Sequence, residues 1–182
     1  MKRIAVLLAV FFVTGCGSKR EPPDDGVGDF SSWPTATEKP IHVEHGLWLL
    51  CSEPTPEQRR ALDAERAERE KTHGPHHRLL SIVVRTNSEA FLAFHARNNL
   101  PVGAIVVKEK HQDSDATEPP VEYAAMIKRE AGYDPAHRDW EYVYVVTQPE
   151  RKVTRGKLEL CIGCHSNAKD TDYLFRTYLP QP

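Results

Sequence analysis

Residues 161–165, Cys-Ile-Gly-Cys-His, constrain what this chain can fold into more than any other stretch of it. Two cysteines separated by two residues and followed at once by a histidine are typical of covalent haem attachment. Cys161 and Cys164 would form thioethers to the vinyl groups of haem c, and His165 would bind the iron. The chain must then build a pocket around a large apolar group, although only residues 166–182 follow the motif.

Two other chemistries use the same residue types, and both fit the sequence less well. A zinc site needs further ligands, and apart from Cys16 the one other cysteine, Cys51, stands alone. His73, His76 and His77 could complete a Cys/His site, but their spacing matches no structural zinc pattern. A redox C-x-x-C pair does not need the adjacent histidine. Cys51 is expected to be a small buried hydrophobe, with pairing between two chains as the alternative.

The first fifteen residues, 1–15, predict a bacterial lipoprotein signal peptide. The apolar run at residues 4–13 is too short to span a bilayer, which needs about 20 residues. Val-Thr-Gly-Cys at residues 13–16 resembles a lipobox, so we expect lipidation of Cys16. The lipid would anchor the protein on the periplasmic side of the cell envelope. An ordinary signal peptide with a cysteine nearby is the alternative.

Residues 16–40 are rich in proline and glycine and have no apolar periodicity, which predicts a flexible tether. Residues 41–182 then form one domain, and the chain is long enough to bury a core without disulfides. The net charge of −2 lacks the basic excess that nucleic-acid binding requires, so no nucleic-acid partner is expected.

Short runs of alternating or β-branched residues predict an α+β fold, mainly an antiparallel β-sheet of about five strands with flanking helices. The strand candidates are residues 41–51, 79–86, 101–111, 121–129 and 139–147. A helix is the alternative for residues 121–129.

Two helices are expected beside the sheet. Residues 55–71 predict a charged helix whose surface is mostly solvated. Residues 88–98 predict a short helix with Asn87 as its N-cap and Phe91 and Phe94 on one face.

The strand candidate at residues 101–111 has two chemically different faces, because alternate side chains of a strand point to opposite sides. One face carries Ala104, Val106, Lys108 and Lys110, and the other carries Ile105, Val107 and Glu109.

The sixth ligand of the iron would separate an electron carrier from a reactive haem. No methionine or histidine follows His165, and after the signal peptide the chain contains one methionine, Met126. Met126 is better explained as a core residue. An open sixth position would let the iron react with small molecules such as NO, hydroxylamine or peroxide. A plain electron-transfer cytochrome stays the alternative.

The chain from about residue 76 to residue 178 resembles the cytochrome P-460 family. The matching segments are IVVRTNSEAFLAF (82–94), PVGAIVVKEKH (101–111), AAMIKREAGYDPAHRDWEYVYV (124–145) and GKLELCIGCHSNAKDTDYLF (156–175). The resemblance implies a five-stranded antiparallel sheet with one c-type haem, often in a homodimer. Members of the family oxidise hydroxylamine and carry a bond from a lysine to the haem. Their relatives, the beta-type cytochromes c-prime, lack that bond and bind NO and CO.

The resemblance also assigns candidate roles to individual residues. Lys108 matches the lysine that would bond to the haem, and Lys110 is the reserve. Arg85 would approach the haem propionates or the distal pocket. A distal carboxylate would handle protons, and Glu122 and Glu130 are the candidates.

Two further expectations accompany these roles. Phe91 and Phe94 are either walls of the distal pocket or, more commonly for such residues, core packing. A separate redox partner would exchange electrons with the haem, and the sequence does not identify it.

Overall fold

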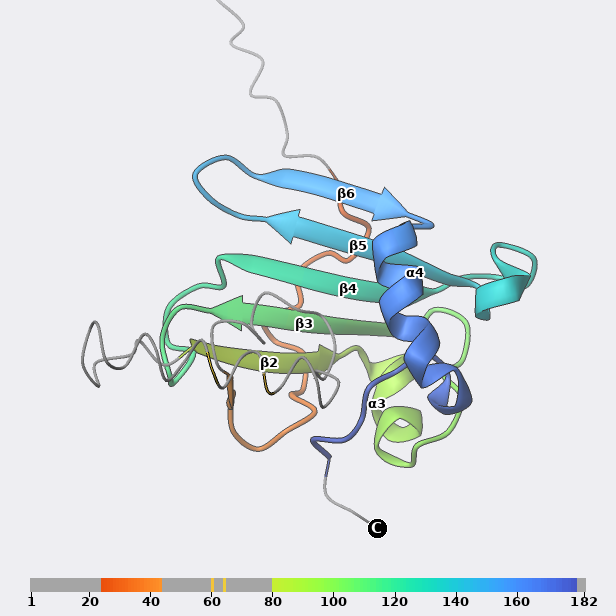
Figure 1. The fold of residues 1–182 in the computed structure, drawn as a ribbon, viewed down its shortest axis with the longest axis horizontal. Helices are drawn as coiled ribbons and strands as arrows, with labels where there is room; N and C mark the ends of the chain where they lie inside the picture. The colour runs from red at the N-terminus through yellow and green to blue at the C-terminus, as the bar shows by residue number, and fades with distance from the viewer. Residues whose placement is uncertain (1–23, 44–59, 61–63, 65–79, 180–182) are drawn as a thin grey trace, which may run out of the picture.

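The computed structural model describes residues 24–43, 60, 64 and 80–179. Its centre is a six-stranded antiparallel sheet in which each strand pairs with the next along the chain (Figure 1). The strands are β1 (Ile41–Val43), β2 (Leu80–Thr86), β3 (Ile105–His111), β4 (Glu122–Lys128), β5 (Trp140–Val146) and β6 (Lys152–Gly156). The predicted fold class, α+β with a mainly antiparallel sheet, is confirmed, with six strands in place of about five.

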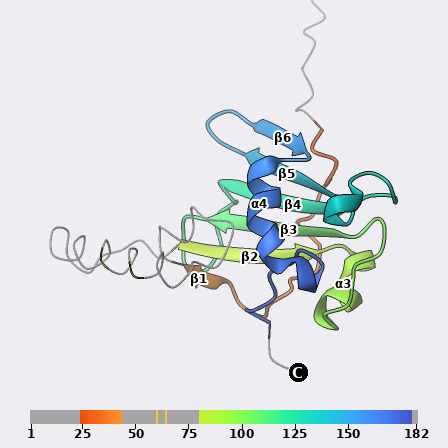
Figure 2. The same cartoon turned by 45° about the vertical axis from the view of Figure 1, so that its right-hand side comes forward.

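Two α-helices lie beside the sheet (Figures 1 and 2). Helix α4 (Glu159–His165) runs across one face of the sheet, and α3 (Ser88–His95) follows β2 at the end of the sheet. Two short 3-10 helices, η1 (Pro135–His137) and η2 (Ser166–Thr171), complete the described elements. We call the sheet face that α4 covers the front face and the opposite one the back face.

The strand missing from the sequence prediction is β6, and the reason lies in its position. It pairs only with β5, from Tyr142–Gly156 to Val146–Lys152, and so forms an edge of the sheet. Edge strands tolerate charged residues, and the sequence of β6, Lys-Val-Thr-Arg-Gly, lacks the apolar run used to recognise the other strands.

The ambiguous segment 121–129 forms the strand β4. Both of its faces are covered: Ala125 and Ile127 belong to the back-face core, and Met126 between them belongs to the front-face core. A strand that is apolar on both faces loses the alternation that distinguishes it from a helix. The predicted charged helix at 55–71 lies outside the described residues, apart from Arg60 and Ala64, which are helical.

The predicted N-cap of the short helix is confirmed. The Asn87 side-chain oxygen accepts a hydrogen bond from the backbone N–H of Ala90 at 3.2 Å and another from Ile105 at 2.9 Å. The cap therefore joins the start of α3 to the start of β3. The helix ends at His95, three residues before the predicted end at Asn98.

The sheet separates two hydrophobic cores. The front core packs α3, α4 and the C-terminal segment against the sheet, and includes Val84, Phe94, Ala104, Val106, Met126, Trp140, Tyr142, Ile162, Tyr173 and Leu174. The back core contains Val27, Val107, Tyr123, Ala125, Ile127, Val143 and Val145, with Phe30, Trp33, Ile105 and Val153 packed against it. The alternation predicted for residues 104–107 is confirmed by this division.

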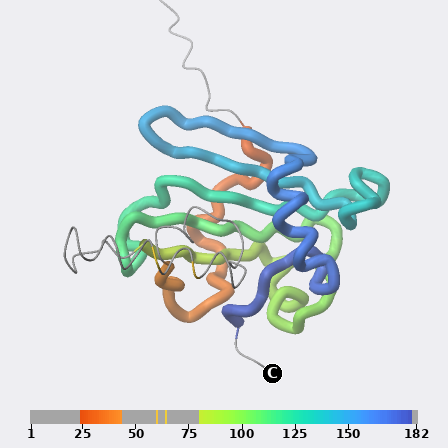
Figure 3. Tube along the Cα trace, viewed as in Figure 1, coloured from red at the N-terminus to blue at the C-terminus, as the bar shows by residue number. Residues whose placement is uncertain are grey.

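Residues 24–40 do not form the flexible tether that their composition predicts. They run across the back face of the sheet, as the orange segment of Figure 3 shows, and continue into β1. Asp25 is buried and binds the Tyr123 hydroxyl and Arg151, and Val27 enters the back core. A few well-spaced apolar and acidic residues suffice to hold a segment rich in proline and glycine. We call residues 24–43 the N-terminal strap.

The remaining predictions about the N-terminal part of the chain fall outside the described residues. These include the signal peptide at 1–15, the lipidation of Cys16 and the role of Cys51. Within the described residues, no helix is both long enough and apolar enough to cross a membrane.

Candidate haem site

Helix α4 carries the Cys-x-x-Cys-His motif and presents it beside the front face of the sheet. Ile162 anchors the helix because its side chain is buried in the front core. Cys161 and Cys164 are both half-buried and three residues apart, which places them on the same side of the helix. Neither cysteine forms a disulfide bond. The helix therefore offers two thiols on one side, next to the imidazole at its C-terminal end.

The orientation of His165 is set by a backbone carbonyl. Its Nδ1 lies 2.7 Å from the carbonyl oxygen of Tyr173, to which it must donate a hydrogen because the oxygen can only accept. The rings of Tyr142 and Phe175 flank the imidazole, with centroids at 5.4 Å and 5.3 Å. With Nδ1 engaged, Nε2 is the nitrogen left to bind a metal.

The surroundings of His165 favour its neutral form. Burial lowers the pKa of the imidazole, and the positive charge of Lys108 lowers it further, while the hydrogen bond to Tyr173 acts in the opposite direction. The net effect is a pKa below the ordinary value for histidine. A neutral imidazole is the form that ligates iron, so the site is preorganised for that role.

The carbonyl that holds His165 comes from an unusual turn. Asp172 and Tyr173 have φ angles of 58° and 62°, so two consecutive residues other than glycine adopt the left-handed conformation. Such a conformation costs about 1–2 kcal/mol per residue. Tyr173 is fixed further by a hydrogen bond from its N–H to Ala168 and one from its hydroxyl to the Ala136 carbonyl.

Lys108 lies on the same face of the sheet as the motif. It pairs with Val84 on β2 and Ala124 on β4, and it follows Val106, which belongs to the front core, by two residues. Its positive charge contributes to the lowered pKa of His165. Two of the residues singled out in the sequence, Lys108 and His165, therefore lie on the same side of the sheet.

Lys110, the reserve candidate, also faces the front but is committed to other contacts. Its amine donates to the Glu122 carboxylate at 3.1 Å and lies over the ring of Tyr144, 5.6 Å from the centroid. The Tyr144 hydroxyl donates to the same carboxylate oxygen at 2.6 Å. Glu122 thus belongs to a front-face polar cluster, whereas Glu130 is exposed.

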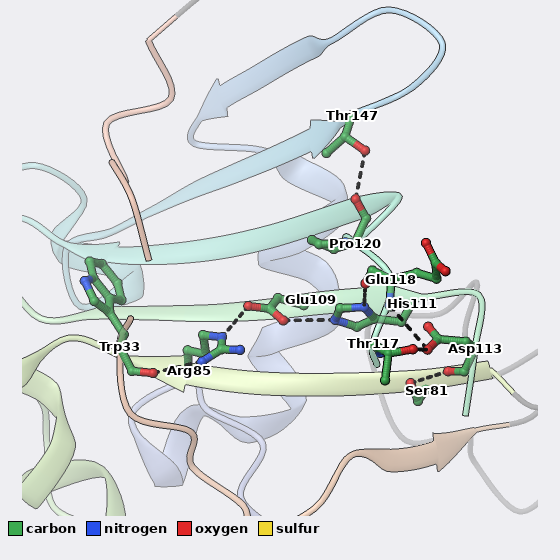
Figure 4. A network of polar contacts seen from close by, with 10 residues as sticks. All are labelled: Trp33, Ser81, Arg85, Glu109, His111, Asp113, Thr117, Glu118, Pro120 and Thr147. Carbon is green, nitrogen blue, oxygen red and sulfur yellow. Dashed lines mark hydrogen bonds and ion pairs between the residues drawn. The ribbon is translucent and has the colours of Figure 1, made fainter. Parts of the chain in front are cut away.

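Arg85 lies on the opposite side of the sheet from the motif. It pairs with Val107, a residue of the back core, and its guanidinium donates to Glu109 at 2.5 Å and to the Trp33 carbonyl at 2.9 Å (Figure 4). Glu109 also accepts from Nε2 of His111 at 2.9 Å. The structure does not bring Arg85 together with His165, because the two side chains lie on different faces.

Of three further residues considered in the sequence, two lie in the front core. Phe94 and Met126 are buried in the front core, in agreement with the core-packing interpretation of each. Phe91 is half-buried, and its ring contacts His95 with centroids 4.7 Å apart.

The residues beside α4 fit a covalently attached haem. Two thiols on one side of a helix and an imidazole with Nε2 available form the donor set that such a group uses. The Tyr142 hydroxyl is buried near His165 and has no hydrogen-bond partner among the described residues, so the site contains an unmatched polar atom. The zinc alternative finds no group of three candidate ligands among those residues, and His73, His76 and His77 lie outside them.

Sequence reasoning missed the residues that orient His165. The acceptor is a backbone carbonyl, so the identity of Tyr173 does not reveal it. The one available signal was the segment Thr171-Asp172-Tyr173, which follows the motif closely enough to fold back onto it.

The cytochrome P460 family model matches residues 62–176, which is well over half of the 182-residue chain. No curated protein matches the sequence significantly.

Proposed function

The chain belongs to the cytochrome P460 family, and from this premise we propose that it is an exported cytochrome with one haem c that binds or converts small nitrogen molecules. Membership implies a haem cofactor. The observation that carries the proposal is the orientation of His165, held through Nδ1 by the Tyr173 carbonyl, on the sheet face that also carries Lys108.

Three residues would hold the haem. Cys161 and Cys164 would form thioethers to its vinyl groups, and His165 would bind the iron through Nε2. The haem, when bound, supplies an iron centre that can take up NO or accept electrons from hydroxylamine. The protein contributes a fixed imidazole, an apolar wall from the front core and the amine of Lys108.

An open sixth position on the iron is the feature that makes this site reactive in our proposal. Met126 is packed in the front core, and His111 faces the back of the sheet. His95 is exposed on α3. These placements support an open position. The competing function is a plain electron carrier, in which Met126 or an upstream histidine would complete the coordination.

The choice between hydroxylamine oxidation and NO binding rests on Lys108. A bond from its amine to the haem requires the neutral amine, and burial against an apolar group lowers the pKa of a lysine in that direction. The amine of Lys110 forms an ion pair with the Glu122 carboxylate at 3.1 Å. A crosslink would leave a haem peptide with two segments, around residues 108 and 161–165, after proteolysis. Haem on the second segment alone would favour NO binding.

Attachment to the membrane is a further part of the proposal. Processing at Cys16 would leave only residues 17–23 between the lipid and the strap, which starts at Asp24. Even a fully extended chain of that length spans at most about 25 Å, so the haem domain would lie close to the membrane surface. Cys16→Ser should release the protein from membranes or leave it unprocessed. An unmodified mature N-terminus downstream of Cys16 would contradict lipidation.

Optical spectra of the purified protein test the proposed reactivity. We expect a high-spin or mixed ferric spectrum and rapid binding of NO or CO by the ferrous protein. A low-spin spectrum that Met126→Ala abolishes would establish the electron carrier instead.

A further inference from the structure

We propose that Asp172 is a positioning residue for the iron ligand, because it fixes the turn whose Tyr173 carbonyl orients His165. The inference rests on the proposed function in one respect, that His165 binds the iron. Asp172 does not contact His165 in any described interaction, so its influence passes through the backbone of the next residue.

The Asp172 carboxylate is the most enclosed part of this turn, with a side-chain exposure of 1%. One oxygen accepts the backbone N–H of Leu100 at 2.8 Å, and the other accepts the Lys128 amine at 2.9 Å. The backbone carbonyl of Asp172 accepts the indole N–H of Trp140 at 2.9 Å. Three segments distant in the sequence therefore converge on one residue: the loop before β3, the end of β4 and the start of β5.

These contacts explain how an unfavourable turn persists. Left-handed residues other than glycine survive where the surrounding structure determines their conformation. Asp172 and Tyr173, with φ of 58° and 62°, are adjacent, and the second of them supplies the carbonyl that lies 2.7 Å from Nδ1 of His165. Relaxation of this turn toward ordinary backbone angles would move that carbonyl.

Charge makes the Asp172 contacts difficult to replace. Lys128 is 12% exposed, and its amine lies 4.4 Å from the centroid of the Trp140 ring. Arg138 adds a second positive charge 3.7 Å from the carboxylate. Removing the negative charge would leave a nearly buried lysine without its anion, which strongly favours rearrangement.

The consequence for the iron follows from the hydrogen bond at Nδ1. A firm hydrogen bond from Nδ1 to an acceptor raises the basicity of the imidazole and fixes its rotation. A loosened carbonyl would weaken the iron–histidine bond and reduce electron donation to the iron. Asp172 would thereby tune the reduction potential from a position outside the haem pocket.

The test compares variants of the full-length haem-loaded protein. Asp172→Asn removes the charge with little change in shape, and Lys128→Gln removes its partner while the Leu100 contact remains. Asp170→Asn, at an exposed position two residues earlier, is the matched control. The measurements are the iron–histidine stretching band of the ferrous protein by resonance Raman spectroscopy and the reduction potential, with circular dichroism to verify folding.

We expect Asp172→Asn to shift the iron–histidine band to lower frequency and to raise the reduction potential. Lys128→Gln should move both in the same direction by a smaller amount, and Asp170→Asn should change neither. A folded Asp172→Asn with an unchanged band and potential would overturn the inference. If Asp172→Asn does not fold, an unchanged band in folded Lys128→Gln overturns it in the same way.

A further variant separates this inference from the proposed function. His165→Ala should eliminate the iron–histidine band of the unaltered protein. Persistence of the band in His165→Ala would mean that another histidine binds the iron, and the proposed function would then fail at the ligand itself. Loss of the band, together with unchanged behaviour of Asp172→Asn, would reject the role of Asp172 alone.

Discussion

The two faces of the sheet use similar residues for different purposes, and strand β3 displays the contrast within three positions. Glu109, Lys110 and His111 are all 3% exposed. Lys110 points to the front, toward the side that carries α4, whereas Glu109 and His111 point to the back. Burial and charge alone therefore do not identify the residues of the candidate site. Those residues are identified by whether they lie on the sheet face that α4 covers.

Charged side chains on the back face form ion pairs and hydrogen bonds with one another. Glu109 joins Arg85 to His111 in one network, as Figure 4 shows. Glu141 forms a second network with two arginines, Arg129 and Arg155. The Glu109 network also holds the N-terminal strap, since Arg85 donates to the Trp33 carbonyl. These contacts are expected to stabilise the fold, and they lie on the face opposite the Cys-x-x-Cys-His motif.

The front face instead gathers groups around the motif. His165 lies between aromatic rings, Lys108 is near enough to lower its pKa, and the Tyr142 hydroxyl has no partner among the described residues. The same strand therefore contributes to the stability of the fold on one side and to the candidate site on the other. Changes on the two faces should therefore have separable effects.

The largest effect should follow removal of both thiols on the front. Cys161→Ala combined with Cys164→Ala should abolish covalent haem, because no thioether can form. The measurement is peroxidase staining of a denaturing gel. Arg85→Gln is the back-face comparison and should retain the stained band. Equal haem loss in a folded Arg85→Gln protein would break the distinction between the faces.

The second largest effect should be on stability, from the back. Glu109→Ala would leave Arg85 and His111 without their shared anion, and the loss of such a partner costs about 3 kcal/mol. Denaturant titration of the haem-loaded protein measures this. Glu118→Ala is the control, because His111 contacts only the backbone carbonyl of Glu118 and the exposed side chain should contribute under about 0.5 kcal/mol. A comparable loss of unfolding free energy in both variants would show that the Glu109 network does not stabilise the fold.

The strap should contribute less than the Glu109 network. Asp25→Asn weakens the contacts to the Tyr123 hydroxyl and Arg151, which we expect to lower the free energy of unfolding by about 1–2 kcal/mol. Asp24→Asn alters the neighbouring exposed carboxylate and is the matched control. Limited proteolysis should also cut the strap sooner in Asp25→Asn. Identical behaviour of the two variants would mean that the strap is not held by Asp25.

The smallest predicted effect is a pH dependence confined to the back face. Burial lowers the pKa of His111, but the Glu109 hydrogen bond, the Glu118 carbonyl and the charges of Glu109 and Asp113 outweigh it, so the pKa is raised. A raised pKa stabilises the fold below the unfolded value of about 6.5, and this stability is lost as pH rises through the folded pKa.

The variant for this prediction is His111→Gln. The difference in unfolding free energy between the unaltered protein and His111→Gln should be larger at about pH 5.5 than at about pH 8.5. His95→Gln, which removes an exposed imidazole, is the comparison. A difference that grows with rising pH would reverse the predicted sign.

The sequence was sufficient to predict the central strands of the sheet and the Cys-x-x-Cys-His motif. The strand runs at 79–86, 101–111 and 139–147 are strongly apolar, and each corresponds to a strand of the structure. The faces of residues 104–107 were also predictable, because alternation there is regular. The edge strand β6 and the packed strap were not, since their residues are polar or rich in proline and glycine and their order comes from distant partners.

The candidate site was predictable only in part. Cys161, Cys164 and His165 are recognised by their spacing, which no other segment reproduces. Arg85 was assigned by resemblance, but β2 is covered on both faces and its residues do not alternate clearly, so its orientation could not be derived. The acceptor for His165 is a main-chain oxygen, and no side-chain pattern encodes it.

Mass analysis of the haem-bearing peptides after proteolysis tests most directly whether the front face beside α4 is the haem site. Our account predicts a haem bound through two thioethers to the peptide that contains residues 161–165. It also predicts that peptides of the N-terminal strap carry no haem. Purified protein from a host able to mature c-type cytochromes, with a 161–165 peptide at its unmodified mass, would contradict the central claim.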